Sequence, residues 1–190
     1  MIFMKINKYI IGVVIVILAL LYRMLPNLPN FSPVAATFLF AGVVFSQRKG
    51  SFWLVLGLLY LSDFALNNTI LRGFYPEATG LIWFSKYMIF TMLSYVLIFA
   101  VGRTLKKIKV IPIVVLSVLS STIFFLLTNA GAWIFDPLNL YPDSLSGLIA
   151  SYLAGLPFYQ TSLVADLVFS AVLFGSYVAI NRIVPKPLNA

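Results

Sequence analysis

The chain has 190 residues, of which 62% are hydrophobic and only 9% are charged, and it contains neither Cys nor His. A soluble domain carries roughly 25% charged residues, so this composition indicates a single integral membrane domain over residues 1–190. The absence of Cys and His excludes disulfides, the usual zinc and haem sites, and Ser–His or Cys–His catalysis. The net charge of +8 forms no basic stripe interleaved with aromatic residues, so no nucleic-acid partner is expected.

Apolar segments divide the chain into candidate membrane spans, because about 20 apolar residues are needed to cross the hydrocarbon layer. The second and third segments are short, and we expect them to tilt or to continue into their loops. The fold predicted is an all-α bundle of six transmembrane helices. The expected helices are Tyr9–Leu25, Phe31–Ser46, Ser51–Leu66, Leu81–Val101, Val110–Thr128 and Thr161–Ile180.

The positive residues are distributed unequally between the connections. All but Arg23, Arg72 and Lys86 lie in the N-terminus, the C-terminal tail, and the second and fourth connections. Because Lys and Arg stay on the cytoplasmic side, both termini are predicted to be cytoplasmic. The sequence therefore predicts a multi-pass protein of the bacterial cytoplasmic (inner) membrane.

The predicted external connections are long and rich in Pro, Asn and aromatic residues. The longest covers residues 129–160, and within it Ser144–Leu156 has the composition of a short interfacial or re-entrant helix. Long irregular loops are unusual unless they bind or gate something. A ligand-binding role on the external side follows as the expectation.

Polar residues gather near the external ends of the predicted helices. The most unusual is Asp166, a carboxylate among Leu, Val, Phe and Ala, and ionisable residues within a membrane are functional candidates because burying them is costly. Polar residues also recur at helical spacing, as in Ser117 and Ser121 on the fifth helix and Asp166 and Ser170 on the sixth. The predicted substrate-binding residues are Asp63, Lys86, Tyr87, Asn129, Trp133, Tyr152, Phe158 and Asp166.

Two interpretations of the buried acids remain open. Asp166 can line an outward-facing polar cavity, in which mainly apolar and aromatic walls carry a few polar groups. Alternatively, Asp63 or Asp166 pairs with Lys86 and fixes the helices relative to each other. The isolated Ser and Thr residues are compatible with ordinary interhelical hydrogen bonds.

Short motifs in a fixed order carry a family resemblance. They are "PNFSPVAATFLFAG" (Pro29–Gly42), "SD" (Ser62–Asp63), "TNAGAW" (Thr128–Trp133), "LPFY" (Leu156–Tyr159) and "DLVFSAVLFG" (Asp166–Gly175). In this order they resemble a family of small bacterial membrane proteins that is similar to the S components of energy-coupling-factor (ECF) vitamin transporters. The resemblance implies a six-helix protein that binds a vitamin-like molecule from outside, without an enzymatic activity or a cofactor.

The same resemblance implies a docking site for a partner. S components use small residues on an early helix to bind the coupling subunit of a transporter driven by ATPases, and the matching residues are Ala36, Thr37 and Ala41. Thr37 and Ala41 have the small-xxx-small spacing that allows close helix packing, so packing within this chain is the alternative. The related solitary cobalamin transporters of the BtuM type use a ligand cysteine, which this chain lacks.

Other classes of function compete with uptake. A non-transporting subunit of a larger membrane complex would have a sealed interior. An intramembrane aspartic hydrolase would use two carboxyl groups close together, one of them protonated, and Asp63 and Asp166 are the candidates. No phosphate-binding loop occurs in the chain, so active transport would need energy from a partner or from an ion gradient.

Overall fold

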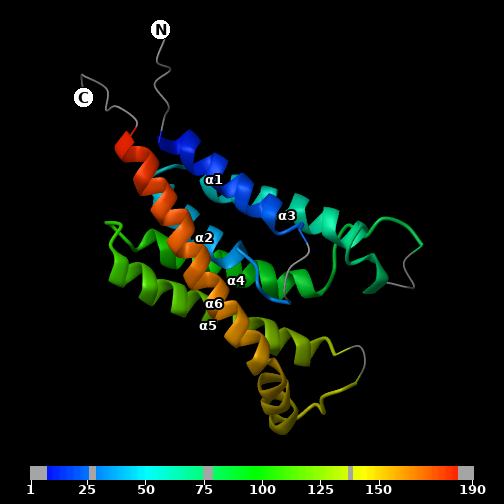
Figure 1. Ribbon diagram of the computed structural model, residues 1–190. Helices are drawn as coiled ribbons and strands as arrows, with labels where there is room; N and C mark the ends of the chain where they lie inside the picture. The colour runs from blue at the N-terminus through cyan, green and yellow to red at the C-terminus, as the bar shows by residue number, and fades with distance from the viewer. Residues whose placement is uncertain (1–7, 26–28, 75–78, 137–138, 184–190) are drawn as a thin grey trace.

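The computed structural model describes residues 8–25, 29–74, 79–136 and 139–183, and within these ranges it is helical throughout, without a β-strand. The elements follow one another along the chain as Figure 1 shows. They are α1 (Lys8–Tyr22), α2 (Val34–Val44), α3 (Ser51–Asn68), a 3₁₀ turn η1 (Arg72–Phe74), α4 (Tyr87–Arg103), α5 (Val110–Ile134) and α6 (Leu145–Ile183). The described part therefore confirms the all-α class and six α-helices.

Helix α2 is the centre of the bundle. It contacts each of the other five α-helices, and Figure 1 shows it enclosed by them. Its sequence, VAATFLFAGVV, has no charged residue, and all of its residues except Val44 are buried. A helix that is hydrophobic on all sides is a core helix, and the other helices cover this one.

Two glycines allow α2 to approach α4 closely. A Cβ atom at Gly42 would lie 2.3 Å from the carbonyl oxygen of Phe99, and one at Gly102 would lie 2.5 Å from that of Leu39. Backbone atoms cannot move aside as a flexible side chain can. Glycine is therefore required at both positions, and this contact fixes where α2 sits along α4.

The expectation of a long loop over residues 129–160 is wrong. Helix α5 continues to Ile134, α6 begins at Leu145, and Pro157 lies inside α6. Proline removes one helical hydrogen bond and bends a helix without always ending it. Figure 1 shows α6 changing direction between its ochre first turns and its straight orange and red part.

The close packing of α5 on α6 explains why these turns are helical. A Cβ atom at Gly155 would lie 2.2 Å from Oδ1 of Asn129, so the side chain of Asn129 on α5 packs directly on the backbone of α6 there. The hydroxyl of Ser151 donates a hydrogen bond of 2.8 Å to the carbonyl of Asn129. Tertiary contacts of this kind override the weak helix propensity of Gly and Pro.

The fourth helix begins six residues later than expected, at Tyr87 instead of Leu81. The side chain of Asn68 holds the preceding segment, since its amide nitrogen donates to the carbonyl of Ile82 (3.0 Å) and its Oδ1 accepts from the N–H of Ile82 (2.9 Å). This two-way pairing keeps the segment extended where a hydropathy pattern alone predicts helix.

Only α5 and α6, among the described helices, are long and apolar enough to cross a membrane. α1, α2 and α4 are shorter apolar helices. The start of α1 and the end of α6 lie at the same end of the bundle (Figure 1). This end, called the basic end below, carries Lys8, Arg48, Lys49, Arg103, Lys106, Lys107, Lys109 and Arg182.

Candidate functional site

Asp166 is buried where α6 crosses the start of α2. Its side chain is 2% exposed, and Oδ1 accepts a hydrogen bond of 3.2 Å from the backbone N–H of Ala36 in the first turn of α2. Pro33, the N-cap residue of α2, provides no capping side chain. Asp166 therefore caps α2 from another helix, and the partial positive charge of the helix N-terminus favours a carboxylate there.

The second oxygen of Asp166 contacts a row of serines between α5 and α6. Its Oδ2 lies 2.6 Å from the hydroxyl of Ser121, and the hydroxyls of Ser117 and Ser170 are 2.7 Å apart. Ser121 also lies 3.2 Å from the carbonyl of Ser117, but its hydroxyl has one hydrogen and can donate to one acceptor at a time. The polar residues on the two helices face each other, as their spacing in the sequence predicts.

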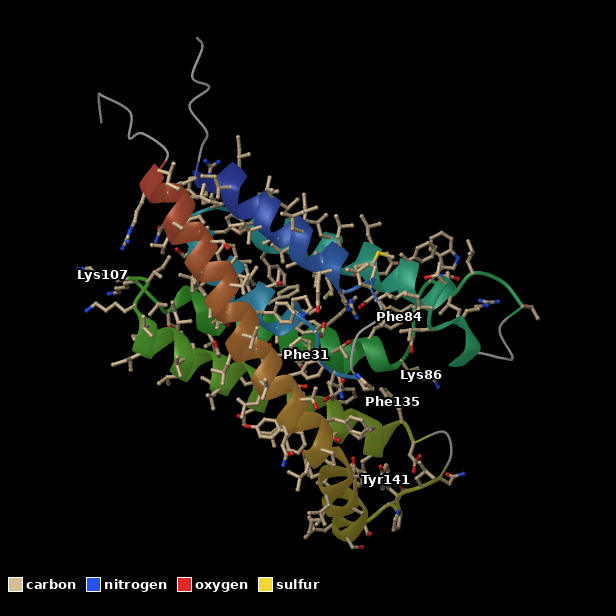
Figure 2. All side chains as sticks on the ribbon, in the orientation of Figure 1. Phe31, Phe84, Lys86, Lys107, Phe135 and Tyr141 are labelled. Carbon is tan, nitrogen blue, oxygen red and sulfur yellow. The ribbon has the colours of Figure 1, made fainter. Side chains whose placement is uncertain are left out.

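Asp63 has a different partner from the one considered in the sequence. It forms an ion pair with Arg23, which follows α1, and the same guanidinium group lies 3.5 Å from the hydroxyl of Ser62. This is the only ion pair among the described residues. Lys86 is exposed, and Figure 2 shows it far from Lys107 and the basic end. The interpretation that Lys86 pairs with Asp63 or Asp166 is therefore wrong.

A cavity of about 570 Å³ lies at the end of the bundle opposite the basic end. Its walls come from α2 to α6 and from the segment between α1 and α2, and both Arg23 and Asp166 contribute to them. A volume of this size is within the usual range for small-molecule sites. The residues around it are Arg23, Leu25, Pro29, Asn30, Ser32, Val34, Ala35, Leu66, Ile70, Leu71, Thr91, Tyr95, Phe124, Ser162 and Asp166.

Aromatic rings form one wall of this cavity. Tyr95 stacks on Phe38 with ring centroids 5.0 Å apart, and on Phe124 with centroids 5.5 Å apart. Tyr95 and Phe124 both line the cavity, whereas Phe38 is fully buried behind them. The rings therefore form a rigid surface suited to a flat ligand.

One polar atom at the cavity wall has no partner. The buried hydroxyl oxygen of Ser32 makes no hydrogen bond within the described part of the chain. Buried polar groups are nearly always paired, so an unpaired one beside a cavity is available to a bound molecule or to water.

A second cavity of about 300 Å³ adjoins the first. The two share the lining residues Asn30, Thr91, Phe124 and Ser162. The second also contains Asn129 and Phe158, two of the predicted binding residues. The hydroxyl of Ser162 donates a 3.5 Å hydrogen bond to the carbonyl of Asn30, which links α6 to the connection between α1 and α2.

Four other predicted binding residues line neither cavity: Asp63, Lys86, Trp133 and Tyr152. The indole N–H of Trp133 donates to the carbonyl of Pro142 (3.0 Å), and the hydroxyl of Tyr152 donates to the carbonyl of Leu126 (3.1 Å). Asp63 reaches the cavity only through Arg23. The side chain of Tyr87 lies outside the described residues.

The predicted docking residues face the interior of this chain. Ala36, Thr37 and Ala41 are at most 1% exposed, and the hydroxyl of Thr37 donates to the carbonyl of Pro33 (2.7 Å). They offer no surface to a partner subunit, so their assignment as a docking site is wrong. These residues pack within the bundle, which was the alternative interpretation of their spacing.

Sequence reasoning missed Arg23, Ser32 and Tyr95 as cavity residues. Arg23 was informative, because it is one of three positive residues on the side opposite the basic end and follows an apolar helix directly. Tyr95 had no comparable signal, since an aromatic residue in an apolar helix is usually a packing residue. In the described part, no three acidic side chains lie close enough to hold a metal ion.

These features define an all-helical protein with two helices that could cross a membrane and a charged cavity at one end. The chain belongs to DUF6580, a family of unknown function whose model matches residues 4–187. No curated protein and no solved structure matches the sequence.

Proposed function

We propose that this protein is a multi-pass membrane protein that binds a small, vitamin-like molecule from the external side, as the substrate-binding component of an uptake system. The observation that carries the proposal is the cavity opposite the basic end, with Arg23 and Asp166 in a largely apolar and aromatic wall. A few convergent polar groups in such a wall are typical of small-molecule sites.

Apolar faces on the outside of the bundle support a membrane location. Helix α5 exposes Val110, Ile111, Val114, Val115, Val118 and Leu119, and α1 exposes Ile10, Val14, Leu18 and Leu21. Faces of this extent are unfavourable in water and need lipid or protein to cover them. Helix α2 is about 16 Å long and is too short to span alone, but other helices surround it, so it does not have to match the bilayer.

The distribution of charge supports an orientation. Positive residues are retained on the cytoplasmic side, which places the basic end inside and the cavity outside. In this orientation a ligand reaches the cavity from the external medium.

The partners of the proposed uptake system would bind elsewhere than α2. An ECF-type coupling subunit with its ATPases remains the proposed source of energy, and the exposed faces of α1, α5 and α6 are the surfaces open to it. The small residues of α2 are buried and offer no surface to such a subunit.

The cavity also separates the proposal from its competitors. A non-transporting subunit was expected to have a sealed interior, which the cavity of about 570 Å³ does not favour. An aspartic hydrolase needs two carboxyl groups that share a proton, but Asp63 binds Arg23 whereas Asp166 binds Ser121 and Ala36.

A cavity-filling variant tests the proposal. The protein, purified from its expression host in mild detergent and incubated with host extract, is denatured, and the released small molecules are measured by mass spectrometry. Ser162→Trp places an indole at the junction of the two cavities, and Val164→Trp is the control because Val164 is on the same helix with an exposed side chain. We expect a molecule released by the wild type and the control and absent from Ser162→Trp; equal amounts from all three would contradict the proposal.

A further inference from the structure

The charges around the cavity do not balance. Arg23 is neutralised by Asp63, so this ion pair adds no net charge to the site. Asp166 has no positive partner among the described residues and binds only an N–H group and a hydroxyl. A buried carboxylate without a counter-charge is unfavourable, and the helix N-terminus compensates only part of it.

We propose that the ligand of this cavity carries a single positive charge on a flat group, such as an amidinium or a protonated heteroaromatic ring, and that this group binds Asp166. The inference rests on the proposed function and specifies its substrate class. The ligand supplies the counter-charge that the chain itself does not.

Asp166 retains the capacity for these bonds. Two carboxylate oxygens have about four acceptor positions, and the N–H of Ala36 and the hydroxyl of Ser121 occupy two of them. Because Asp166 lines the cavity, a ligand N–H group can use the others. Hydrogen bonds between charged groups are shorter and stronger than neutral ones, which favours a cationic donor over a neutral amide.

The walls favour a flat cation in particular. The rings of Tyr95 and Phe124 border the same cavity as Asp166, and a cation is further stabilised where it lies over the face of such a ring. The unpaired hydroxyl of Ser32 provides one more polar contact. The adjoining cavity at Asn129 and Phe158 has room for a substituent that extends away from the charged group.

Three probes of nearly the same shape test the charge requirement: benzamidine, benzamide and benzoate are cationic, neutral and anionic. Their dissociation constants are measured from the thermal midpoint of the detergent-solubilised protein across a concentration series. For the wild type we expect benzamidine to bind about tenfold more tightly than benzamide. Benzoate should bind most weakly, because Arg23 is already paired.

Two variants locate the effect. Asp166→Asn keeps the shape of the side chain and should make benzamidine and benzamide bind equally. Asp143→Asn removes an exposed acid and should leave the tenfold preference unchanged. If Asp166→Asn does not fold, the three probes on the wild type still decide whether the site requires a positive charge.

Each other outcome overturns the proposal. Equal binding of benzamide and benzamidine to the wild type would show that a neutral donor suffices. Tighter binding of benzoate would make Arg23 the selecting residue, and a wild type that benzamidine does not stabilise would exclude a cationic site. None of these results would contradict small-molecule binding itself, since the release experiment with Ser162→Trp does not depend on the charge of the ligand.

Discussion

Two buried aspartates at the same end of this protein are satisfied in different ways. Asp63 on α3 forms an ion pair with Arg23, whereas Asp166 on α6 binds a backbone N–H group and a serine hydroxyl. Asp63 is 7% exposed and Asp166 is 2% exposed, so the more deeply buried carboxylate is the one without a positive partner.

The difference separates a structural charge from an available one. An ion pair within the chain holds two helices together, and its charge is neutralised before any ligand arrives. The charge of a carboxylate that caps a helix is only partly compensated by the helix N-terminus, and some of its acceptor positions stay free. Under the proposed function, Asp166, and not Asp63, is therefore the residue expected to select the ligand.

A displacement of α2 should have the largest effect, because the hydrogen bond by which Asp166 caps α2 depends on the position of this helix. In Gly42→Ala the new Cβ would lie 2.3 Å from the carbonyl of Phe99, and we expect a loss of about 3 kcal/mol in the free energy of unfolding, the upper end of the usual overpacking cost. Chemical denaturation in detergent measures it. Gly57→Ala is the control, since Gly57 is in α3 with open space around it and should gain up to about 1 kcal/mol.

Breaking the ion pair should have the next largest effect. Arg23→Met leaves the Asp63 carboxylate without a partner, and we expect a loss of about 2 kcal/mol, less than for a fully buried pair because Arg23 is 20% exposed. The double variant Arg23→Met with Asp63→Leu should recover most of the loss. If the double variant is as unstable as the single one, Arg23 stabilises the fold by contacts other than the ion pair.

Neutralising Asp166 should cost less stability. In Asp166→Asn the amide oxygen still accepts from the N–H of Ala36, and its amide nitrogen can donate to Ser121, so we expect a loss of about 1 kcal/mol. Thermal melting in detergent checks this value. A loss larger than that of Arg23→Met would show that the charge of Asp166 is the main stabilising feature at this end.

Removing Lys86 should have the smallest effect. Its side chain is exposed, so Lys86→Met should change the free energy of unfolding by no more than about 0.5 kcal/mol, both in the wild type and in Asp166→Asn. If Lys86→Met restored the stability lost in Asp166→Asn, this would support an ion pair between Asp166 and Lys86, which the structure does not contain.

The sequence predicts the parts of this molecule that depend on local pattern. Apolar periodicity gives six helices, and a carboxylate in an apolar segment marks Asp166 as exceptional. The serines of α5 and α6 meet because their spacing puts each set on one helix face. The fully apolar sequence of α2 also carried a signal for a central helix, although the family resemblance implied a docking surface there.

Other parts depend on contacts that no local pattern encodes. The partner of Asp63 is Arg23 and not Lys86, because the choice depends on where the end of α1 and the start of α4 lie in space relative to α3. Pro157 and Gly155 look like a helix boundary, but packing of Gly155 against Asn129 keeps the chain helical. The extended start of the fourth segment depends on one side chain, that of Asn68.

The side of the membrane from which the cavity opens is tested most directly by thiol labelling, since the chain has no cysteine of its own. Ser162→Cys places a thiol at the cavity, and Lys107→Cys places one at the basic end. In intact cells, a membrane-impermeant thiol reagent should label Ser162→Cys, and label Lys107→Cys only after the cells are permeabilised. Labelling of Lys107→Cys but not of Ser162→Cys in intact cells would contradict ligand binding from outside.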